Sequence, residues 1–148
     1  MDNTKTFYEL AKKYCKFVTE EEISFDTIPA LIEMLMNLYI CAINLPEPEN
    51  VTTKESPSEL MKIESIRINE QIEPFYWEIY DPFIQEEPVC GYLPDDLIDI
   101  ANDLLIGISE YDSGRIGNAA FEWKLGLSSH WGFHVVDALR ALHSLISI

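Results

Sequence analysis

Basic residues and long apolar runs are both scarce in this sequence of 148 residues. Ten Lys and Arg oppose 26 Asp and Glu, which gives a formal net charge of −16 at pH 7. Such a surface repels polyanions, so we expect no nucleic acid and no anionic membrane as a partner, whereas a basic protein would be attracted. The longest uncharged stretch covers only 34–46, well short of the roughly 20 residues that span a bilayer.

Paired cysteines and familiar catalytic motifs are also missing. Cys15, Cys41 and Cys90 form no C-x-x-C spacing, which excludes a zinc ribbon and a dithiol redox motif. Free thiols and the absence of a signal-peptide pattern predict a cytoplasmic protein. There is no glycine-rich phosphate loop, nucleophile elbow, HExxH motif or EF-hand loop. These absences exclude the easily recognised nucleotide-binding and protease classes, and no motif calls for a cofactor.

Helical periodicity dominates what is present, because apolar residues recur at three- and four-residue steps. We therefore predict an all-α, single-domain bundle (1–148) with an exposed loop near 46–57 and an aromatic-rich irregular segment near 75–92. Gly126, Ser128-Ser129 and Gly132 are weak points where the last helix can break. The expected helices are five: 4–19, one from an Asp26 cap to Pro46, 57–73 after a Ser-Pro-Ser-Glu capping box, 93–111 and 118–147.

Three side chains on the last expected helix form the main candidate site. His130, His134 and Asp137 follow one another at i, i+4 and i+7, which places them on one side of a helix. Two imidazoles and a carboxylate suit a divalent metal ion when a neighbouring helix supplies a further ligand, here Asp96, Asp99 or Asp103. The alternative is that the histidines are structural, hydrogen-bonded on an apolar packing face. A solvated helix start likewise explains Asp95 and Asp96 without chemistry.

A second candidate is the aromatic cluster within 75–83. Trp and Tyr are frequent hot spots of protein interfaces, so Trp77 and Tyr80 are candidate partner-binding residues. The alternative is that the cluster closes one end of the bundle by packing. Residues 51–100 also carry 12 Asp and Glu against 3 Lys and Arg, so the acidic surface is concentrated around this segment.

The C-terminal third carries a distinctive pattern: Glu122-Trp123, then His130-Trp131-Gly132-x-His134, then Asp137-Ala138-Leu139-Arg140-Ala141-Leu142-His143. It resembles a bacterial family of small acidic helical proteins known only as a domain of unknown function. The helix 7–17, the Tyr76-Trp77-Glu78 segment and the acidic helix 93–105 are also similar, and the loop 46–57 is the least similar part. The resemblance implies a bacterial cytosolic helical protein and assigns no activity or catalytic residue.

Three functions remain open from the sequence. We expect first a non-enzymatic interaction module, an adaptor or an immunity-like protein that binds a basic partner. The alternative is a metal-dependent hydrolase with a His/Asp site on the last helix, and a second alternative is a purely structural or oligomer-forming domain. The oligomeric state is not predicted.

Overall fold

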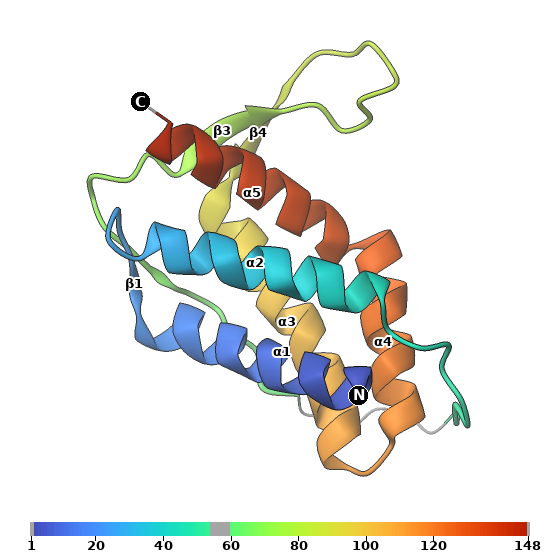
Figure 1. The fold of residues 1–148 in the computed structure, drawn as a ribbon. Coiled ribbons are helices and arrows are strands. Elements are labelled where there is room, and N and C mark those ends of the chain that lie inside the picture. Colours follow the sequence, from blue (N-terminus) through green and yellow to red (C-terminus); the bar gives the residue numbers. More distant parts are fainter. Residues whose placement is uncertain (1, 54–59, 148) are drawn as a thin grey trace.

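The computed structural model, which describes residues 2–53 and 60–147, is a helical bundle and confirms the predicted all-α class (Figure 1). None of the helices in these ranges is both long and apolar enough to cross a membrane. The described helices are α1 (Asn3–Glu20), α2 (Ile28–Ile43), α3 (Leu93–Asp112), α4 (Ile116–Ser129) and α5 (Trp131–Ile146).

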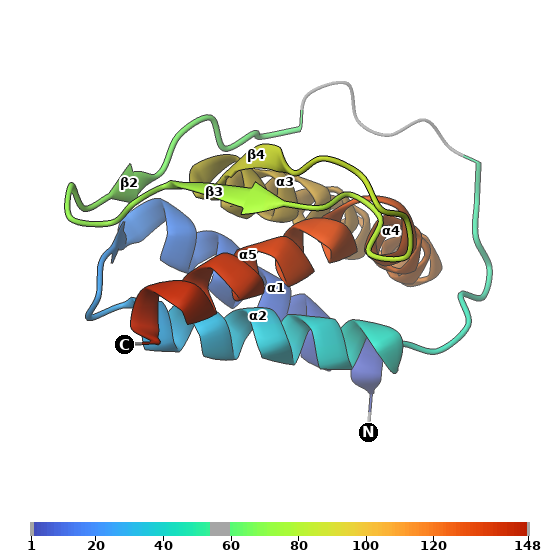
Figure 2. The ribbon, with the colours of Figure 1, turned by 90° about the horizontal axis from the view of Figure 1, so that it is seen from above.

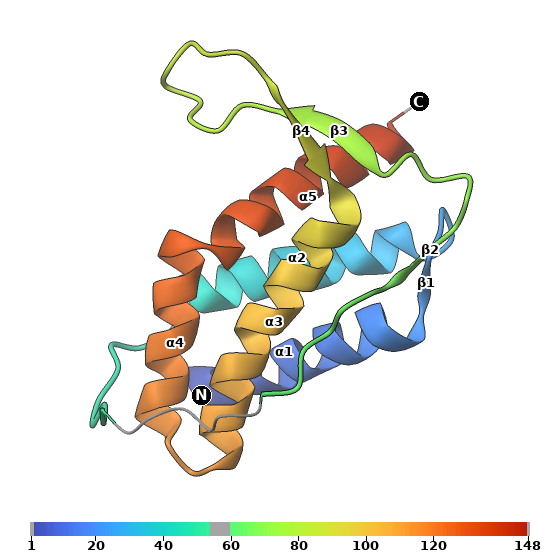
Figure 3. The same ribbon diagram turned by 180° about the vertical axis from the view of Figure 1, so that it is seen from behind.

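Helix α3 is the centre of the bundle and packs against α1, α4 and α5 (Figure 3). The largest side chains of the core, Phe7, Tyr14, Trp123 and Trp131, are fully buried. Their polar atoms keep partners: the Tyr14 hydroxyl donates to the Leu97 carbonyl at 2.9 Å and the Trp123 indole N–H to the Leu104 carbonyl at 3.1 Å. Burial of large aromatic surface without orphaned donors fixes how these helices meet.

Two short pairs of strands connect the helices. β1 (Glu22–Ile23) runs parallel to β2 (Arg67–Ile68), and β3 (Phe75–Glu78) pairs antiparallel with β4 (Val89–Tyr92). The β3–β4 hairpin lies along one side of the bundle, with β3 on the side of α5 (Figure 2). β4 continues directly into α3. Tyr76 faces Gly91 across the hairpin, where any Cβ would collide with the tyrosine ring. The hairpin therefore delivers Tyr76 to the first turn of α3.

The predicted helix over 57–73 is wrong for 60–73, which form no helix, and its expected cap lies outside the described residues. Backbone groups in this segment bond to distant partners instead. The Asn102 side chain accepts from the Ile63 N–H at 2.8 Å and donates to its carbonyl at 3.0 Å, and the Asn69 N–H donates to the Ile23 carbonyl. Such long-range bonds override local helix propensity.

The predicted last helix is divided at His130, the residue between α4 and α5. Gly132 allows this break, because a Cβ there would collide with the Leu127 carbonyl oxygen. At the start of α2, Thr27 occupies the cap position that was predicted for Asp26. The break matters most for function, since it places His130 at the junction of two helices.

Candidate functional site

One face of α3 presents three carboxylates to the start of α5. Asp96, Asp99 and Asp103 follow at i, i+3 and i+7, the spacing that keeps side chains on one face of a helix. The Asp96 carboxylate accepts a hydrogen bond from His134 Nδ1 at 2.8 Å, and the Asp103 carboxylate accepts one from His130 Nδ1 at 2.7 Å. Each histidine is therefore held by its own aspartate.

The opposite ring nitrogens of the two histidines converge. His130 Nε2 and His134 Nε2 lie 3.3 Å apart, and an Asp99 carboxylate oxygen lies 3.4 Å from His134 Nε2. One ligand atom from each of the three residues lies within 4.8 Å of the others. Nitrogens bound tetrahedrally to one zinc ion at about 2.0–2.1 Å lie about 3.3 Å apart. The two imidazoles thus have the separation that one shared metal ion requires.

The protonation states at this cluster are constrained. A carboxylate can only accept, so both Nδ1 atoms must carry their protons. In two neutral rings both Nε2 atoms then present lone pairs to each other at 3.3 Å. A cation relieves this repulsion, either an added proton on one ring or a metal ion between them. The pKa of His134 is raised, chiefly by its hydrogen bond to Asp96 and against the effect of burial.

The residues predicted as metal ligands from the sequence take different positions. Asp99, His130 and His134 form the ligand cluster. Asp103 lies outside it and accepts the hydrogen bond from Nδ1 of His130. Asp137 lies outside this three-residue cluster, beside Glu78 of the hairpin. Burial and the neighbouring Glu78 carboxylate raise the pKa of Asp137 to about 7. Asp137 is therefore outside the three-residue cluster, although it is close enough to His134 to contribute to the raised pKa of that imidazole.

Tyr76 is the site residue that sequence reasoning missed, and Asp96 takes another role than the metal ligand that its spacing predicted. The alternative placed Asp96 at a solvated helix start, but its side chain is buried. One of its carboxylate oxygens holds His134, and the other accepts from the Tyr76 hydroxyl, which also lies 3.1 Å from Glu78. Burial and the hydrogen bond to Asp96 raise the pKa of Tyr76. The spacing of Asp96 with Asp99 and Asp103 was the signal in the sequence that placed Asp96 on the same helix face as these two carboxylates.

The aromatic segment does not close the end of the bundle as the packing alternative predicted. Trp77 is 74% exposed and Tyr80 is 83% exposed, and Phe83 is also exposed. Both Trp77 and Tyr80 line a groove of about 800 Å³ between the hairpin and α5, and Asp137 lies in the same groove. These side chains are thus available for contact with another molecule.

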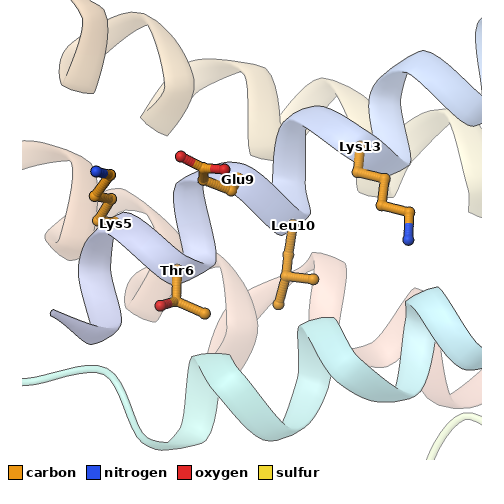
Figure 4. Close-up of a pocket in the computed structure, with 5 residues that line it drawn as sticks. All are labelled: Lys5, Thr6, Glu9, Leu10 and Lys13. Carbon is orange, nitrogen blue, oxygen red and sulfur yellow. The ribbon is translucent and has the colours of Figure 1, made fainter. Parts of the chain in front are cut away.

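Two smaller depressions lie on the surface, and only one of these two is next to the ligand cluster. One of about 260 Å³ is lined by Asp103, Glu122 and His130, next to the ligand cluster. The pKa of Glu122 there is raised by burial and by nearby carboxylates. The other, of about 460 Å³, is lined by five residues of α1, from Lys5 to Lys13 (Figure 4). It contains none of the candidate residues.

The fold recurs in a solved structure. The crystal structure of protein BF1032 from Bacteroides fragilis is similar over 98% of this chain and 95% of its own, with a TM-score of 0.70 at 20% sequence identity. At that identity the similarity shows the fold alone. No curated protein sequence matches the chain. The model of a family described as "Domain of unknown function (DUF5063)" matches residues 1–147, and the chain therefore belongs to the DUF5063 family.

Proposed function

We propose that the protein binds one divalent transition-metal ion through His130 Nε2, His134 Nε2 and a carboxylate oxygen of Asp99. The carrying observation is the convergence of the two Nε2 atoms at 3.3 Å while both Nδ1 atoms are engaged by carboxylates. This carboxylate–histidine arrangement behind a metal fixes the tautomer and the orientation of each ring.

The donor set indicates the kind of metal. Two imidazoles and one carboxylate suit Zn²⁺ or Fe²⁺, and three protein ligands leave at least one coordination position open. The cluster is accessible: the side chain of His130 is 50% exposed and that of Asp99 is 42% exposed. Open coordination at an accessible site is typical of catalytic rather than structural metal sites.

Hydrolysis is the reaction that this arrangement supports best. A metal ion bound there would lower the pKa of a coordinated water and so supply a nucleophile at neutral pH. The 260 Å³ depression beside His130 offers room for a small scissile group. Glu122 lines it, and burial raises the pKa of its carboxyl, the direction that favours a proton donor to a leaving group.

Elemental analysis of tag-free protein tests metal binding directly. After incubation with Zn²⁺, Mn²⁺ or Fe²⁺ and desalting, we expect about one ion per chain in the wild type. We expect His134→Ala and Asp99→Asn to lose the ion. His143→Ala, which removes an exposed histidine outside the cluster, is the matched control and should retain it. No retained ion in the wild type, or equal retention in His134→Ala, would contradict the proposal.

The hydrolase assignment needs a separate measurement. Metal-loaded protein is assayed with bis(p-nitrophenyl) phosphate and p-nitrophenyl acetate. We expect turnover by the wild type that Asp99→Asn abolishes and Glu122→Gln reduces. Metal binding without turnover of either compound above the Asp99→Asn background would leave a metal-binding protein and remove the hydrolytic role.

Binding of a basic partner, as an adaptor or an immunity-like protein does, is the second function that we propose. The exposure of Trp77 and Tyr80 next to an excess of acidic residues favours it. Complementary charge would speed the encounter, and the aromatic side chains would anchor the complex. Immobilised protein should retain a basic protein from a bacterial lysate and release it as salt is raised. Recovery of no basic protein at any salt concentration would contradict this function.

A further inference from the structure

The groove between the hairpin and α5 combines exposed apolar side chains with carboxyl groups. Its apolar wall includes Trp77 and Tyr80 from the hairpin side and Phe133 and Val136 from α5. Phe133 is 55% exposed, so large apolar surface on both sides of the groove faces open space. Contiguous exposed apolar surface of this kind marks binding sites in proteins. A volume of about 800 Å³ exceeds what one side chain fills.

Two acidic side chains give the groove its charge. Glu78 and Asp137 both line it, and each is only partly exposed. They lie so close that the pKa of Asp137 is raised to about 7, with burial as the main cause and Glu78 as the next. Arg140 also lines the groove, yet it makes no ion pair within the described ranges. The groove thus holds two carboxyl groups against one guanidinium, and an incoming ammonium or guanidinium group at Glu78 and Asp137 would be stabilised by them and by the neighbouring aromatic rings.

The backbone of β3 indicates an extended ligand. Five consecutive residues, 76–80, line the groove, so the groove follows the edge of the strand rather than one of its faces. In the part of the chain that the structure describes, β3 pairs only with β4. Its other edge, on the α5 side, therefore offers unpaired N–H and C=O groups, which commonly bind an added peptide strand.

We infer that this groove binds an extended segment of a partner protein that carries lysine or arginine at alternate positions. The segment would lie along β3, with apolar side chains against Trp77 and Phe133 and a basic side chain at Glu78 and Asp137. This inference rests on the proposed binding of a basic partner and gives that partner a place and a recognition chemistry. It requires no bound metal ion.

The test uses two synthetic decapeptides, one of alternating lysine and valine and one of alternating glutamate and valine. Trp123 and Trp131 are fully buried, so a change in tryptophan emission on titration reports Trp77. Calorimetry gives the dissociation constants. We expect the lysine peptide to bind and the glutamate peptide not to bind. Asp137→Asn and Trp77→Ala should each weaken binding by about tenfold or more.

Glu9→Gln is the matched control, because it also removes one carboxylate from an exposed surface but lies on α1, outside the groove. It should leave the dissociation constant within about twofold at physiological salt. If Glu9→Gln weakens binding as much as Asp137→Asn, the overall charge binds the peptide and the groove inference fails.

Two further outcomes separate the groove from the broader binding function. Lysine-peptide binding that is insensitive to both Asp137→Asn and Trp77→Ala would overturn the groove inference and leave basic-partner binding in place. No binding of the lysine peptide at millimolar concentration would overturn the groove inference, and the lysate experiment alone would then decide the broader function. All titrations are repeated with EDTA, and we expect no change, since a bound metal ion takes no part.

Discussion

The ligand cluster and the groove lie on either side of Asp96 and are built in opposite ways. In the cluster, residues from α3 and the start of α5 are fixed by short hydrogen bonds, so that His130 and His134 each have one orientation. In the groove, Trp77 and Tyr80 project from the hairpin and are mostly exposed. Fixed donors suit a small ion that tolerates little misplacement, whereas exposed aromatic side chains suit a larger ligand that they can enclose.

The two regions share one carboxylate. One Asp96 oxygen holds His134 and the other holds Tyr76, whose hydroxyl also contacts Glu78 of the groove. Hydrogen bonds therefore run from the groove to a candidate metal ligand. Whether the regions act separately or together is consequently a measurable property.

Trp131→Ala should damage both regions, because it removes a fully buried ring next to His130. Such a truncation in a core costs about 3–5 kcal/mol of unfolding free energy. Denaturant unfolding measures it, and we expect loss of metal and peptide binding together. Trp77→Ala is the control, since an exposed ring should change stability by only about 0.5 kcal/mol. A small loss in Trp131→Ala would mean that the junction of α4 and α5 is held by other contacts.

Asp96→Asn and Asp137→Asn should separate the two regions. Loss of a carboxylate behind a ligating histidine typically weakens metal binding by about 10–100-fold, so we expect this from Asp96→Asn with peptide affinity within about twofold. Asp137→Asn should do the reverse, weakening the lysine peptide and leaving the metal affinity unchanged. Competition with a chelating dye measures the metal affinity. If each substitution weakens both ligands equally, the regions form one coupled site.

The sequence predicted the elements whose stability is local. Helix α3 was predicted to within one residue at its end, because Pro94, the first-turn carboxylates and the apolar periodicity are all local signals. The segment 60–73 failed for the opposite reason. Its backbone bonds to the Asn102 side chain and to Ile23, partners that are distant in sequence. No local pattern records such bonds.

The candidate site was likewise predictable only where its contacts follow from local helix spacing. The i, i+4 spacing brought His130 and His134 together correctly, because that spacing survives at the first turn of α5. The same periodicity grouped Asp137 with them. The structure instead places Asp137 beside Glu78, which the hairpin brings from about 60 residues away in sequence. Tyr76 and buried Asp96 depend on the same hairpin, so helix periodicity alone could not pair them.

The stability of the wild type should decrease as pH rises from 5 to 8. The pKa of Asp137 is about 7 in the folded chain and near 3.9 when unfolded. The folded state therefore binds the additional proton between about pH 4 and pH 7, and its unfolding free energy falls as that proton is lost. The raised pKa of His134 acts in the same direction as pH rises above its unfolded value.

Asp137→Asn isolates the carboxyl contribution. After allowance for its partial exposure, we expect the difference between pH 5 and pH 8 to shrink by on the order of 1–2 kcal/mol in this variant. Urea unfolding at both pH values measures it, with Glu9→Gln as the control that should keep the wild-type dependence. An unchanged dependence in Asp137→Asn would show that the Asp137 carboxyl does not hold the additional proton of the folded state.

Tyr76→Phe should have the smallest effect and decides how far the two regions are coupled. It removes only the hydroxyl that joins Asp96 to Glu78 and keeps the ring that fills the space over Gly91. Because Asp96 keeps its bond to His134, we expect metal affinity to change by no more than about threefold and stability by about 1 kcal/mol. A larger change in metal affinity, reversed when the lysine peptide is added, would instead show that a ligand in the groove acts on the cluster through Tyr76 and Asp96.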